Sequence, residues 1–345
     1  MRRFAELFWT LDRLTATGDK RAALIAYFGQ TPPRDLAWAL WLLSGGKIGG
    51  AGRKLAGNGE LRQWIGEASG LPDWLVDECY DQVGDLAETL ALLAPGGGGG
   101  GSARGLAGWI EQVLLPVANR EEPVRRAVIR QAWRELDEPA RLVFNKLLTG
   151  SLRVGVSRGL VQQALAQVAE VDIALIAQRM LGNWTPSEAF VAALLRPEPQ
   201  AQDRAQPYPF YLASPLENGT DALGAVADWL LEWKWDGIRL QLIRREGVVA
   251  LWSRGEERLD GRFPEIEAAA AALSADAVID GELLAWDGDR PAPFAALQTR
   301  IQRRKPGPRT LAATPVRVMA YDLLELAGED LRAQPLERRR ARLAE

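Results

Sequence analysis

Apolar residues recur every three to four positions through the first 195 residues of the chain, a spacing that predicts amphipathic α-helices. The same region is rich in Ala, Leu, Arg and Glu, which favour helix, and it has few β-branched runs. The first half of the chain is therefore predicted to be all-α. Its helices are expected over residues 1–14, 34–43, 85–94, 104–117, 123–136 and 158–169.

Beyond residue 209 the pattern changes to short alternating or continuous apolar runs, which are typical of β-strands. The stretch LQLIRREGVVALWSRG (240–255) predicts a hairpin that turns at its Glu-Gly pair. Residues 277–294 predict a second strand pair with an Asp-Gly turn, and residues 316–331 predict a strand, a turn and a helix. This half is predicted to be α+β with a mainly antiparallel sheet.

Two stretches interrupt these patterns. Six consecutive glycines, Gly96–Gly101, lie within residues 95–105 and predict a flexible linker between helices. No Gly-Lys-Ser/Thr follows them, which argues against a phosphate-binding loop. The proline-rich, polar segment 196–209 has no periodicity and is the expected domain boundary. We therefore expect a helical domain over residues 1–200 and an α+β domain over residues 201–345.

The residue types present narrow the chemistry. The chain is 47% hydrophobic and 25% charged, and no apolar run approaches the roughly 20 residues that span a bilayer, so a cytoplasmic protein is expected. Cys79 is the single cysteine and histidine is absent. Disulfides within the chain, cysteine-cluster zinc sites and His-dependent catalysis are thereby excluded. Any metal is expected to be a hard, oxygen-liganded ion such as magnesium.

The distribution of charge is more informative than the net charge of −3 at pH 7. That balance argues weakly against a nucleic-acid partner, since nucleic-acid-binding domains usually carry a basic excess. Acidic residues gather over residues 73–88, whereas basic residues gather over 125–134, 300–305 and 338–342. Local patches set local electrostatic fields, so nucleic-acid binding stays open.

The segment EWKWDGIR (232–239) holds the first candidate for chemistry. Its lysine, Lys234, precedes an Asp-Gly pair and is flanked by two tryptophans. One interpretation is a surface lysine at a strand end beside a type I′ Asp-Gly turn. The other is a nucleophile. On a strand both indoles would point away from the amine, and a partly desolvated lysine near Arg239 would hold more of its amine in the free form.

Three further candidates follow in order along the second half. Ser253-Arg254 ends the second strand of the predicted hairpin, Glu282 follows another Asp-Gly pair, and Tyr321 lies in a predicted strand. Each has an ordinary structural explanation, as a strand end, a turn and a core tyrosine. Their ordered combination is more specific than any one of them.

The series E-x-K-x-D-G-x-R, S-R, D-G-E and aromatic-Asp-Leu resembles the motif series of ATP-dependent DNA ligases. These ligases belong to the covalent nucleotidyltransferases, together with RNA ligases and mRNA capping enzymes. Two further stretches are similar to the ligase segments on either side of the aromatic motif: PFAALQTRIQRR (293–304) before it and AGEDLRAQPLERRRARL (327–343) after it. FNKLLTGSLRVGVSRGLVQQALA (144–166) resembles a signature of the N-terminal DNA-binding domain, of the bacterial type. The resemblance implies a helical DNA-binding domain followed by an adenylation domain.

The resemblance also implies a reaction. Lys234 would attack the α-phosphorus of ATP, expel pyrophosphate and form a lysyl-AMP phosphoramidate, which requires an amine and no histidine. AMP would pass to the 5′-phosphate of a nick, and the neighbouring 3′-OH would displace it. ATP and Mg²⁺ are the implied cofactors, with Asp236 expected to help order the metal or the DNA end. The implied partner is nicked double-stranded DNA, bound by a monomeric, nucleoid-associated protein in replication, repair or recombination.

The other motif residues receive roles from the same resemblance. Arg239 and Arg254 would clamp phosphates, because a guanidinium pairs with phosphate oxygens through two hydrogen bonds. Glu282 would bind the ribose hydroxyls and assist a metal. Tyr321 would stack on adenine, where many ligases have phenylalanine. Glu232 would accept a hydrogen bond from the adenine amino group.

Two loops of the helical half are candidates for contacts with DNA phosphates. In TGSLRVGVS, small residues would let backbone N–H groups approach phosphates, and an arginine would add charge. SGGKIGGAGRKL (44–55) offers further basic residues, and an ordinary helix-connecting loop is the alternative in both cases. Such contacts carry no sequence preference, as nick recognition requires. The candidate residues are Lys47, Arg53, Lys54, Thr149, Ser151, Arg153, Gly155 and Ser157.

Other functions stay open at this point. An RNA ligase or capping-type enzyme would share the K-x-D-G core, although such enzymes usually lack a large helical N-terminal half. An NAD-dependent DNA ligase would usually carry a four-cysteine zinc site. A non-catalytic DNA-binding module would make Lys234 structural. The chain ends at Glu345, before the later motifs and the OB-fold domain of these ligases. We therefore expect either a fragment of a longer ligase or a ligase whose missing part is a separate piece.

Overall fold

The computed structural model describes residues 1–48, 55–96, 102–198, 200–217, 219–303 and 305–345. They form two compact units. The helical unit comprises Met1–Ile176 and Thr185–Pro197, and the sheet unit comprises Ala177–Trp184 and Glu198–Glu345. The predicted fold class, an all-α region followed by an α+β region with an antiparallel sheet, is confirmed. Among the described residues, no helix is long and apolar enough to cross a membrane.

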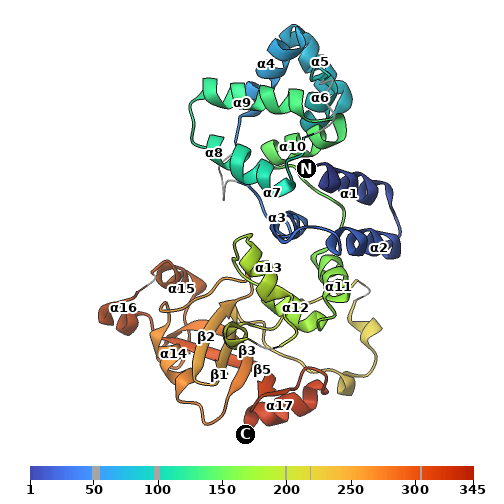
Figure 1. Ribbon diagram of the computed structural model, residues 1–345. Coiled ribbons are helices and arrows are strands. Elements are labelled where there is room, and N and C mark those ends of the chain that lie inside the picture. The colour runs from blue at the N-terminus through green and yellow to red at the C-terminus, as the bar shows by residue number, and fades with distance from the viewer. Residues whose placement is uncertain (49–54, 97–101, 199, 218, 304) are drawn as a thin grey trace. The chain divides into compact units, whose positions relative to one another are not determined.

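The helical unit has helices where the apolar spacing predicts them (Figure 1). Residues 104–117, predicted as one helix, contain two short α-helices separated by a π-helical turn, Ile110–Leu114. The predicted glycine linker lies largely outside the described residues. The helices are α1 (Arg2–Arg13), α2 (Thr17–Phe28), α3 (Pro33–Leu43), α4 (Asn58–Ser69), α5 (Asp73–Val83), α6 (Leu86–Leu93), α7 (Leu106–Trp109), α8 (Leu115–Val117), α9 (Glu122–Glu135), α10 (Glu138–Thr149), α11 (Arg158–Ala169), α12 (Ile173–Arg179), which extends into the sheet unit, and α13 (Glu188–Leu194).

Two buried polar side chains of α10 join it to its neighbours. Arg141 is 4% exposed, and its guanidinium donates to three backbone carbonyls near the C-terminal ends of α6 and α9. Carbonyls at helix C-termini lack an intrahelical partner, so one cation satisfies several of them. Asn145 accepts a hydrogen bond from the indole of Trp133 at 2.8 Å and donates to a carbonyl of α6. These bonds fix how the three helices pack.

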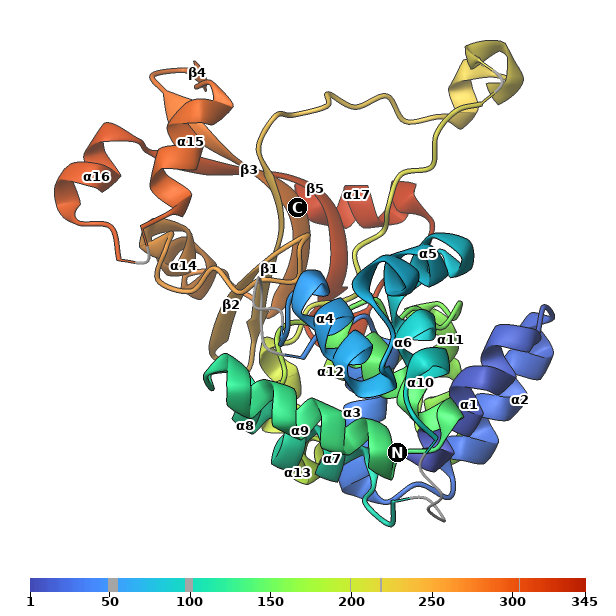
Figure 2. The same cartoon turned by 90° about the horizontal axis from the view of Figure 1, so that it is seen from above.

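The sheet unit is built on an antiparallel sheet in the order β2-β1-β3-β5-β6, with β4 paired to β3 (Figures 1 and 2). The Asp-Gly turn predicted within residues 277–294 is found at Asp287-Gly288, between β3 and β4. The strands are β1 (Ile238–Arg245), β2 (Val248–Ser253), β3 (Ala277–Asp287), β4 (Arg290–Pro291), β5 (Val316–Leu326) and β6 (Glu329–Asp330). The helices are α14 (Pro264–Ala271), α15 (Phe294–Ile301), α16 (Pro308–Ala313) and α17 (Leu336–Ala344).

The hairpin of β1 and β2 is confirmed, and its alternation gives the sheet two different faces. Glu246 and Gly247 have φ of 47° and 78°, as a type I′ turn requires. Leu240 and its same-face neighbours join an apolar core with residues of α14 and α15. Gln241 points to the opposite face, where it is fully buried and bonds both the N–H and the carbonyl of Tyr208. The chain before β1 is thereby held on this second face.

Two glycines, Gly237 and Gly281, belong to Asp-Gly pairs that do not form turns. Neither has a positive φ, and Gly281 lies inside β3. A Cβ on Gly281 would lie 2.8 Å from the carbonyl oxygen of Met319 on β5, and one on Gly237 would lie 2.3 Å from that of Leu283 on β3. The turn interpretation of both pairs is therefore wrong. These glycines permit close approach of neighbouring backbones.

Replacement of Gly281 by Ala is expected to destabilise the sheet by about 1–3 kcal/mol, because the added Cβ meets a backbone carbonyl held in the ladder. Hydrogen exchange of the β3 and β5 amides measures the local free energy of opening. Gly307→Ala is the control, since nothing lies within 4 Å of its added Cβ. Equal losses in the two variants would contradict the explanation from close approach.

Candidate functional site

A cleft of about 1240 Å³ opens on the sheet unit. Its lining comes from the segment before β1, the adjoining ends of β1 and β2, the middle of β3 and β5, and α17. Strand pairing therefore brings together residues that lie far apart in the sequence. All the residues predicted to bind nucleotide or metal, or to act as the nucleophile, line it: Glu232, Lys234, Asp236, Arg239, Arg254, Glu282 and Tyr321.

Lys234 lies on an irregular segment, because β1 begins only at Ile238. The two flanking tryptophans therefore do not lie on a strand opposite the amine, as was predicted, and Trp233 is 82% exposed. The Lys234 side chain is exposed at the cleft, and among the residues that the structure describes it has no hydrogen-bond or ion-pair partner. Its amine is accessible to a ligand in the cleft.

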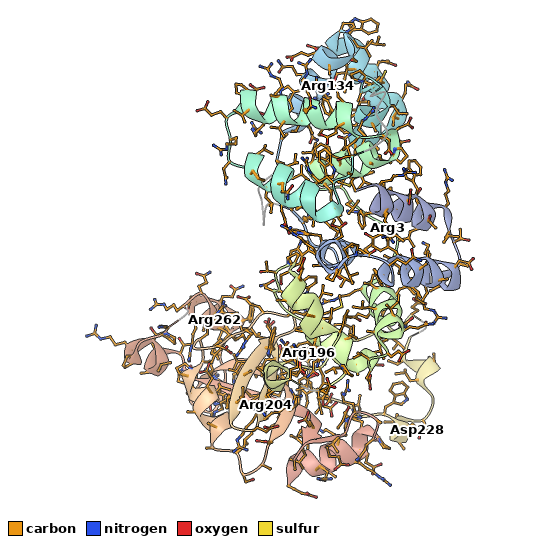
Figure 3. All side chains as sticks on the ribbon, in the orientation of Figure 1. Arg3, Arg134, Arg196, Arg204, Asp228 and Arg262 are labelled. Atoms are coloured by element: carbon orange, nitrogen blue, oxygen red, sulfur yellow. The ribbon has the colours of Figure 1, made fainter. Side chains whose placement is uncertain are left out.

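The segment that carries Lys234 runs out from the sheet and returns to it (Figure 2). It contains short 3₁₀ turns at Thr220–Leu223 and Val226–Asp228. The second turn ends at Asp228, which is labelled in Figure 3. Large apolar side chains on it are exposed, among them Leu231. The segment is fixed to the sheet at its two ends, where it meets the cleft.

Arg239 and Asp280 form the central ion pair of the cleft. Nε and Nη2 of Arg239 donate to the two carboxylate oxygens at 3.1 and 2.8 Å, and Nη1 donates to the carbonyl oxygen of Tyr211 at 2.5 Å. Burial raises the pKa of the Asp280 carboxyl, and the Arg239 charge opposes that rise. The pairing raises the pKa of Arg239. Asp280 was not among the predicted site residues, although it lies two residues from Glu282 on one strand and so shares its face.

Tyr321 is directed into the cleft by a β-bulge. The register of β3 and β5 shifts between Asp280 and Gly281, which leaves Tyr321 as the extra residue of β5. A bulge bends its strand and re-aims a side chain. The Tyr321 hydroxyl donates to Asp280 at 3.3 Å, and the Arg239 guanidinium lies 5.8 Å from the ring centroid and 5.7 Å from that of Phe210. Burial, followed by the Asp280 charge, raises the pKa of the Tyr321 hydroxyl.

Glu282 and Arg254 complete the charged lining beside Arg239. Glu282 is the partner of Arg239 across β1 and β3. Burial raises the pKa of the Glu282 carboxyl, opposed by a hydrogen bond from the Gly237 N–H and by the two arginines. The Arg254 backbone N–H donates to the Arg239 carbonyl at 3.0 Å, which fixes its position. The exposed Arg254 guanidinium has no partner within the described part of the chain, so it is available to an anion.

Glu232 and Arg340 form an ion pair at the edge of the cleft. Nη1 of Arg340 lies 3.4 Å from Oε1 of Glu232 and donates to the carbonyl oxygen of Tyr321 at 2.8 Å. Arg340 lies on α17, within the segment 327–343 that resembles a ligase segment as a whole. The sequence held no separate signal for it.

The metal-binding prediction has limited support in the side chains. The described residues contain no cluster of three or more His, Cys, Asp or Glu that would hold an ion by itself. Asp236 and Glu282 both line the cleft, and carboxylate oxygens suit magnesium. Magnesium usually takes one or two carboxylates and completes its shell with phosphate oxygens and water. The two carboxylates therefore fit an ion that arrives with a nucleotide.

The hydroxyl groups predicted to contact DNA have partners within the helical unit. Thr149 donates to a carbonyl of α10, and its oxygen lies 2.7 Å from that of Ser151. Ser157 caps α11 by accepting from a backbone N–H. Arg53 and Lys54 lie outside the described residues. The hydroxyls thus shape the loop between α10 and α11.

Two cations, Arg153 and Lys20, lie in or beside that loop. Arg153 is exposed, and Gly155 has a positive φ of 62°. Lys20 of α2, which the sequence analysis missed, donates to the Gly155 carbonyl at 2.9 Å. Lys47 is exposed in the second glycine-containing loop. The structure thus places Lys20 beside the predicted loop.

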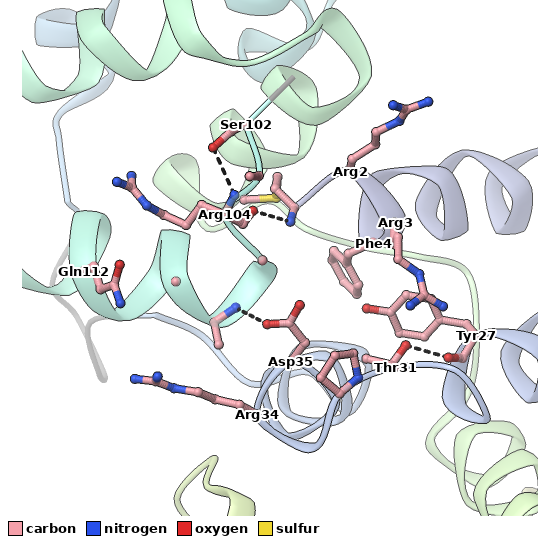
Figure 4. Close-up of a pocket in the computed structure, with 16 residues that line it drawn as sticks. Arg2, Arg3, Phe4, Tyr27, Thr31, Arg34, Asp35, Ser102, Arg104 and Gln112 are labelled. Atoms are coloured by element: carbon pink, nitrogen blue, oxygen red, sulfur yellow. Dashed lines mark hydrogen bonds between the residues drawn. The ribbon is translucent and has the colours of Figure 1, made fainter. Parts of the chain in front are cut away.

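A second pocket, of about 600 Å³, lies in the helical unit (Figure 4). Arg2, Arg3 and Arg34 line it, but each guanidinium is bonded to a group outside the pocket lining. Asp35 accepts the backbone N–H groups that open α7. Arg2 thus pairs within α1, and the other three charges join α1 and α3 to neighbouring segments. The cleft of the sheet unit is therefore the candidate site.

Known proteins resemble both parts of the chain. Residues 1–166 match the family model of the DNA ligase N terminus, and residues 210–345 match that of the ATP dependent DNA ligase domain. A probable DNA ligase of Opitutus terrae is 36% identical over 246 residues, which cover 60% of this chain and 24% of that protein.

Two relatives match almost the whole chain. A probable DNA ligase of Koribacter versatilis is 27% identical over 97% of this chain and 59% of its own length. A DNA ligase of Aeropyrum pernix is 26% identical over 99% of this chain and 62% of its own length. The chain therefore spans less than two thirds of the length of these relatives.

Asp280→Ala is expected to lower the local stability of β1 and β3 by about 1.5–3 kcal/mol, because it leaves the Arg239 guanidinium without its carboxylate. Hydrogen exchange of the amides of both strands measures the loss. Asp260→Ala is the control. Asp260 and its partner Arg258 have side chains that are 47% and 44% exposed, so their ion pair should contribute less than about 1 kcal/mol to stability. A loss in Asp280→Ala no larger than the control would show that the pair does not support the cleft.

Proposed function

The chain belongs to the ATP-dependent DNA ligase family, and on this premise we propose that Lys234 forms a covalent bond to AMP during the sealing of nicks in duplex DNA. The observation that carries the proposal is the position of the Lys234 amine, which has no bonded partner among the described residues and lies in a cleft with Glu282, Arg254 and Tyr321. A lysine held among groups suited to phosphate, ribose and base is placed for attack on a nucleotide.

The proposed step is a displacement at phosphorus. The neutral amine of Lys234 attacks the α-phosphorus of ATP, a nitrogen–phosphorus bond forms, and the bond to the oxygen that bridges to the β-phosphate breaks. Pyrophosphate leaves with that oxygen, and the amine loses its proton to solvent. Positioning and charge neutralisation supply most of the catalysis in such transfers. Mg²⁺, held through Asp236 and Glu282, would offset charge on the triphosphate.

The two arginines have different parts in this proposal. The guanidinium of Arg254, which has no partner among the residues that the structure describes, binds phosphate oxygens. Three of the five N–H groups of Arg239 are engaged by Asp280 and Tyr211, so Arg239 mainly holds the site and offers only its remaining donors to a phosphate. The Tyr321 ring stacks on the base, in an orientation fixed by its bond to Asp280.

The helical unit is proposed to bind the DNA duplex. Its match to the ligase N terminus supports DNA over an RNA or capping substrate. Arg153 and Lys20 supply charge beside the loop between α10 and α11, and Lys47 supplies more on the other loop. After lysyl-AMP formation, AMP passes to the 5′-phosphate of the nick and the 3′-OH displaces it.

Incubation with α-³²P-ATP and magnesium is expected to label the denatured protein, with the label released as AMP by acid. Lys234→Ala and Lys234→Arg should both abolish it, because a guanidinium is not a nucleophile at neutral pH. Lys305→Ala, which removes another exposed lysine of the sheet unit, should label normally. Absence of label from the unaltered chain, or label that persists in Lys234→Ala, would rule out this nucleophile.

Arg153→Gln is expected to weaken binding to a nicked duplex several-fold and to reduce the slope of log affinity against log salt by about 1, as loss of one phosphate contact predicts. Fluorescence anisotropy over a salt series measures both. Arg134→Gln removes the same charge from the exposed face of α9 (Figure 3) and should leave the slope unchanged. Identical effects of both variants would argue for a diffuse charge effect and against the loop.

A further inference from the structure

Arg340 connects three parts of the candidate site. It lies on α17, its Nη1 donates to the carbonyl of Tyr321 at 2.8 Å, and the same nitrogen lies 3.4 Å from Oε1 of Glu232. Tyr321 and Glu232 are the two residues proposed to meet the base. A single guanidinium therefore touches the backbone of the stacking residue and the side chain of the hydrogen-bonding one.

We propose that Arg340 is a positioning residue that orients the Glu232 carboxylate toward the base and so contributes to the choice of nucleotide. The inference rests on the proposed function, because it assumes that the cleft binds a nucleoside triphosphate. One carboxylate oxygen of Glu232 faces Arg340, which leaves Oε2 for the amino group of a base. A base with an amino group at this edge is accepted, and one with a carbonyl oxygen there is repelled.

The exposure of the pair argues that it serves positioning and not stability. The side chains of Arg340 and Glu232 are 37% and 45% exposed, and ion pairs this exposed contribute little to folding. Arg339, the preceding residue, has the structural part. Its Nε and Nη2 bond both carboxylate oxygens of Asp322 on β5, and these side chains are 15% and 18% exposed.

Glu232 needs such a partner because its own segment is irregular. The residues on either side, Leu231 and Trp233, are 83% and 82% exposed, so packing does not fix the Glu232 backbone. An unrestrained glutamate loses side-chain entropy each time it binds a ligand. The bond to Arg340, itself held by α17 and β5, supplies part of that order beforehand.

Label formation at a series of ATP and GTP concentrations tests the inference in Arg340→Ala, Arg340→Lys and Arg338→Ala. Arg340→Ala should raise the half-saturating ATP concentration about tenfold, leave the rate at saturation within about twofold, and narrow the preference for ATP over GTP. Arg340→Lys should have an intermediate half-saturating ATP concentration, because lysine keeps the charge but cannot hold both the Tyr321 carbonyl and the Glu232 carboxylate in the same geometry. Arg338 is exposed on the same helix, so Arg338→Ala should have the half-saturating ATP concentration and the nucleotide preference of the unaltered chain.

A double-mutant cycle with Glu232→Gln decides whether Arg340 acts through Glu232. In the Glu232→Gln background, Arg340→Ala should have no further effect on half-saturation or nucleotide preference. Additive effects of the two substitutions on half-saturation would overturn the inference. So would an Arg340→Ala protein that keeps its preference for ATP over GTP, or one that loses only the labelling rate at saturating ATP.

Equilibrium binding of a non-hydrolysable ATP analogue separates this inference from the proposed function. If the unaltered chain binds the analogue but does not label, the assignment of Lys234 fails, while a tenfold weaker binding in Arg340→Ala still supports the positioning role. If the unaltered chain does not bind the analogue, both fail.

Discussion

The bidentate pair of Arg239 and Asp280 is the interaction on which the cleft depends. It crosses from β1 to β3, receives the hydroxyl of Tyr321 from β5, and holds the chain before β1 through the carbonyl of Tyr211. A buried carboxylate requires a partner, and a guanidinium offers donors in a planar fork that can satisfy several acceptors at once. One ion pair thus fixes the relative positions of three strands and of the chain around Tyr211.

The two faces of the sheet divide the work of folding and function. One face packs against helices through apolar side chains. On the other face, buried polar groups hold the chain that precedes β1. Gln241 hydrogen-bonds to the backbone of Tyr208, and the Tyr208 hydroxyl donates to Glu325 at 2.6 Å. Arg245 forms an ion pair with the same glutamate at 2.9 Å. Polar groups in such a place are directional, so they set a unique register for the chain. The cleft lies on this second face, since Arg239 is two residues from Gln241 on β1 and lines it.

Local features were predictable from the sequence, and features set by distant contacts were not. The hairpin at Glu246-Gly247 follows from its turn residues, and the long helices follow from apolar spacing. Gly281 has the same local sequence signal as a turn glycine, but its role depends on β5, a strand from far along the chain. Likewise, no local pattern shows that a bulge directs Tyr321, or that residues 177–184 join the sheet unit.

Lys234 is exposed on an irregular segment, but it lies close to a glycine that is anchored on the sheet. Gly237 is held against β3 by close approach and by its bond to Glu282, and Lys234 lies three residues before it. Extended chain covers about 3.3–3.6 Å per residue, so the lysine Cα stays within roughly 10 Å of that anchor however the outer part of the segment moves. The cleft thus combines side chains that are fixed on paired strands with a lysine that a short tether keeps near them.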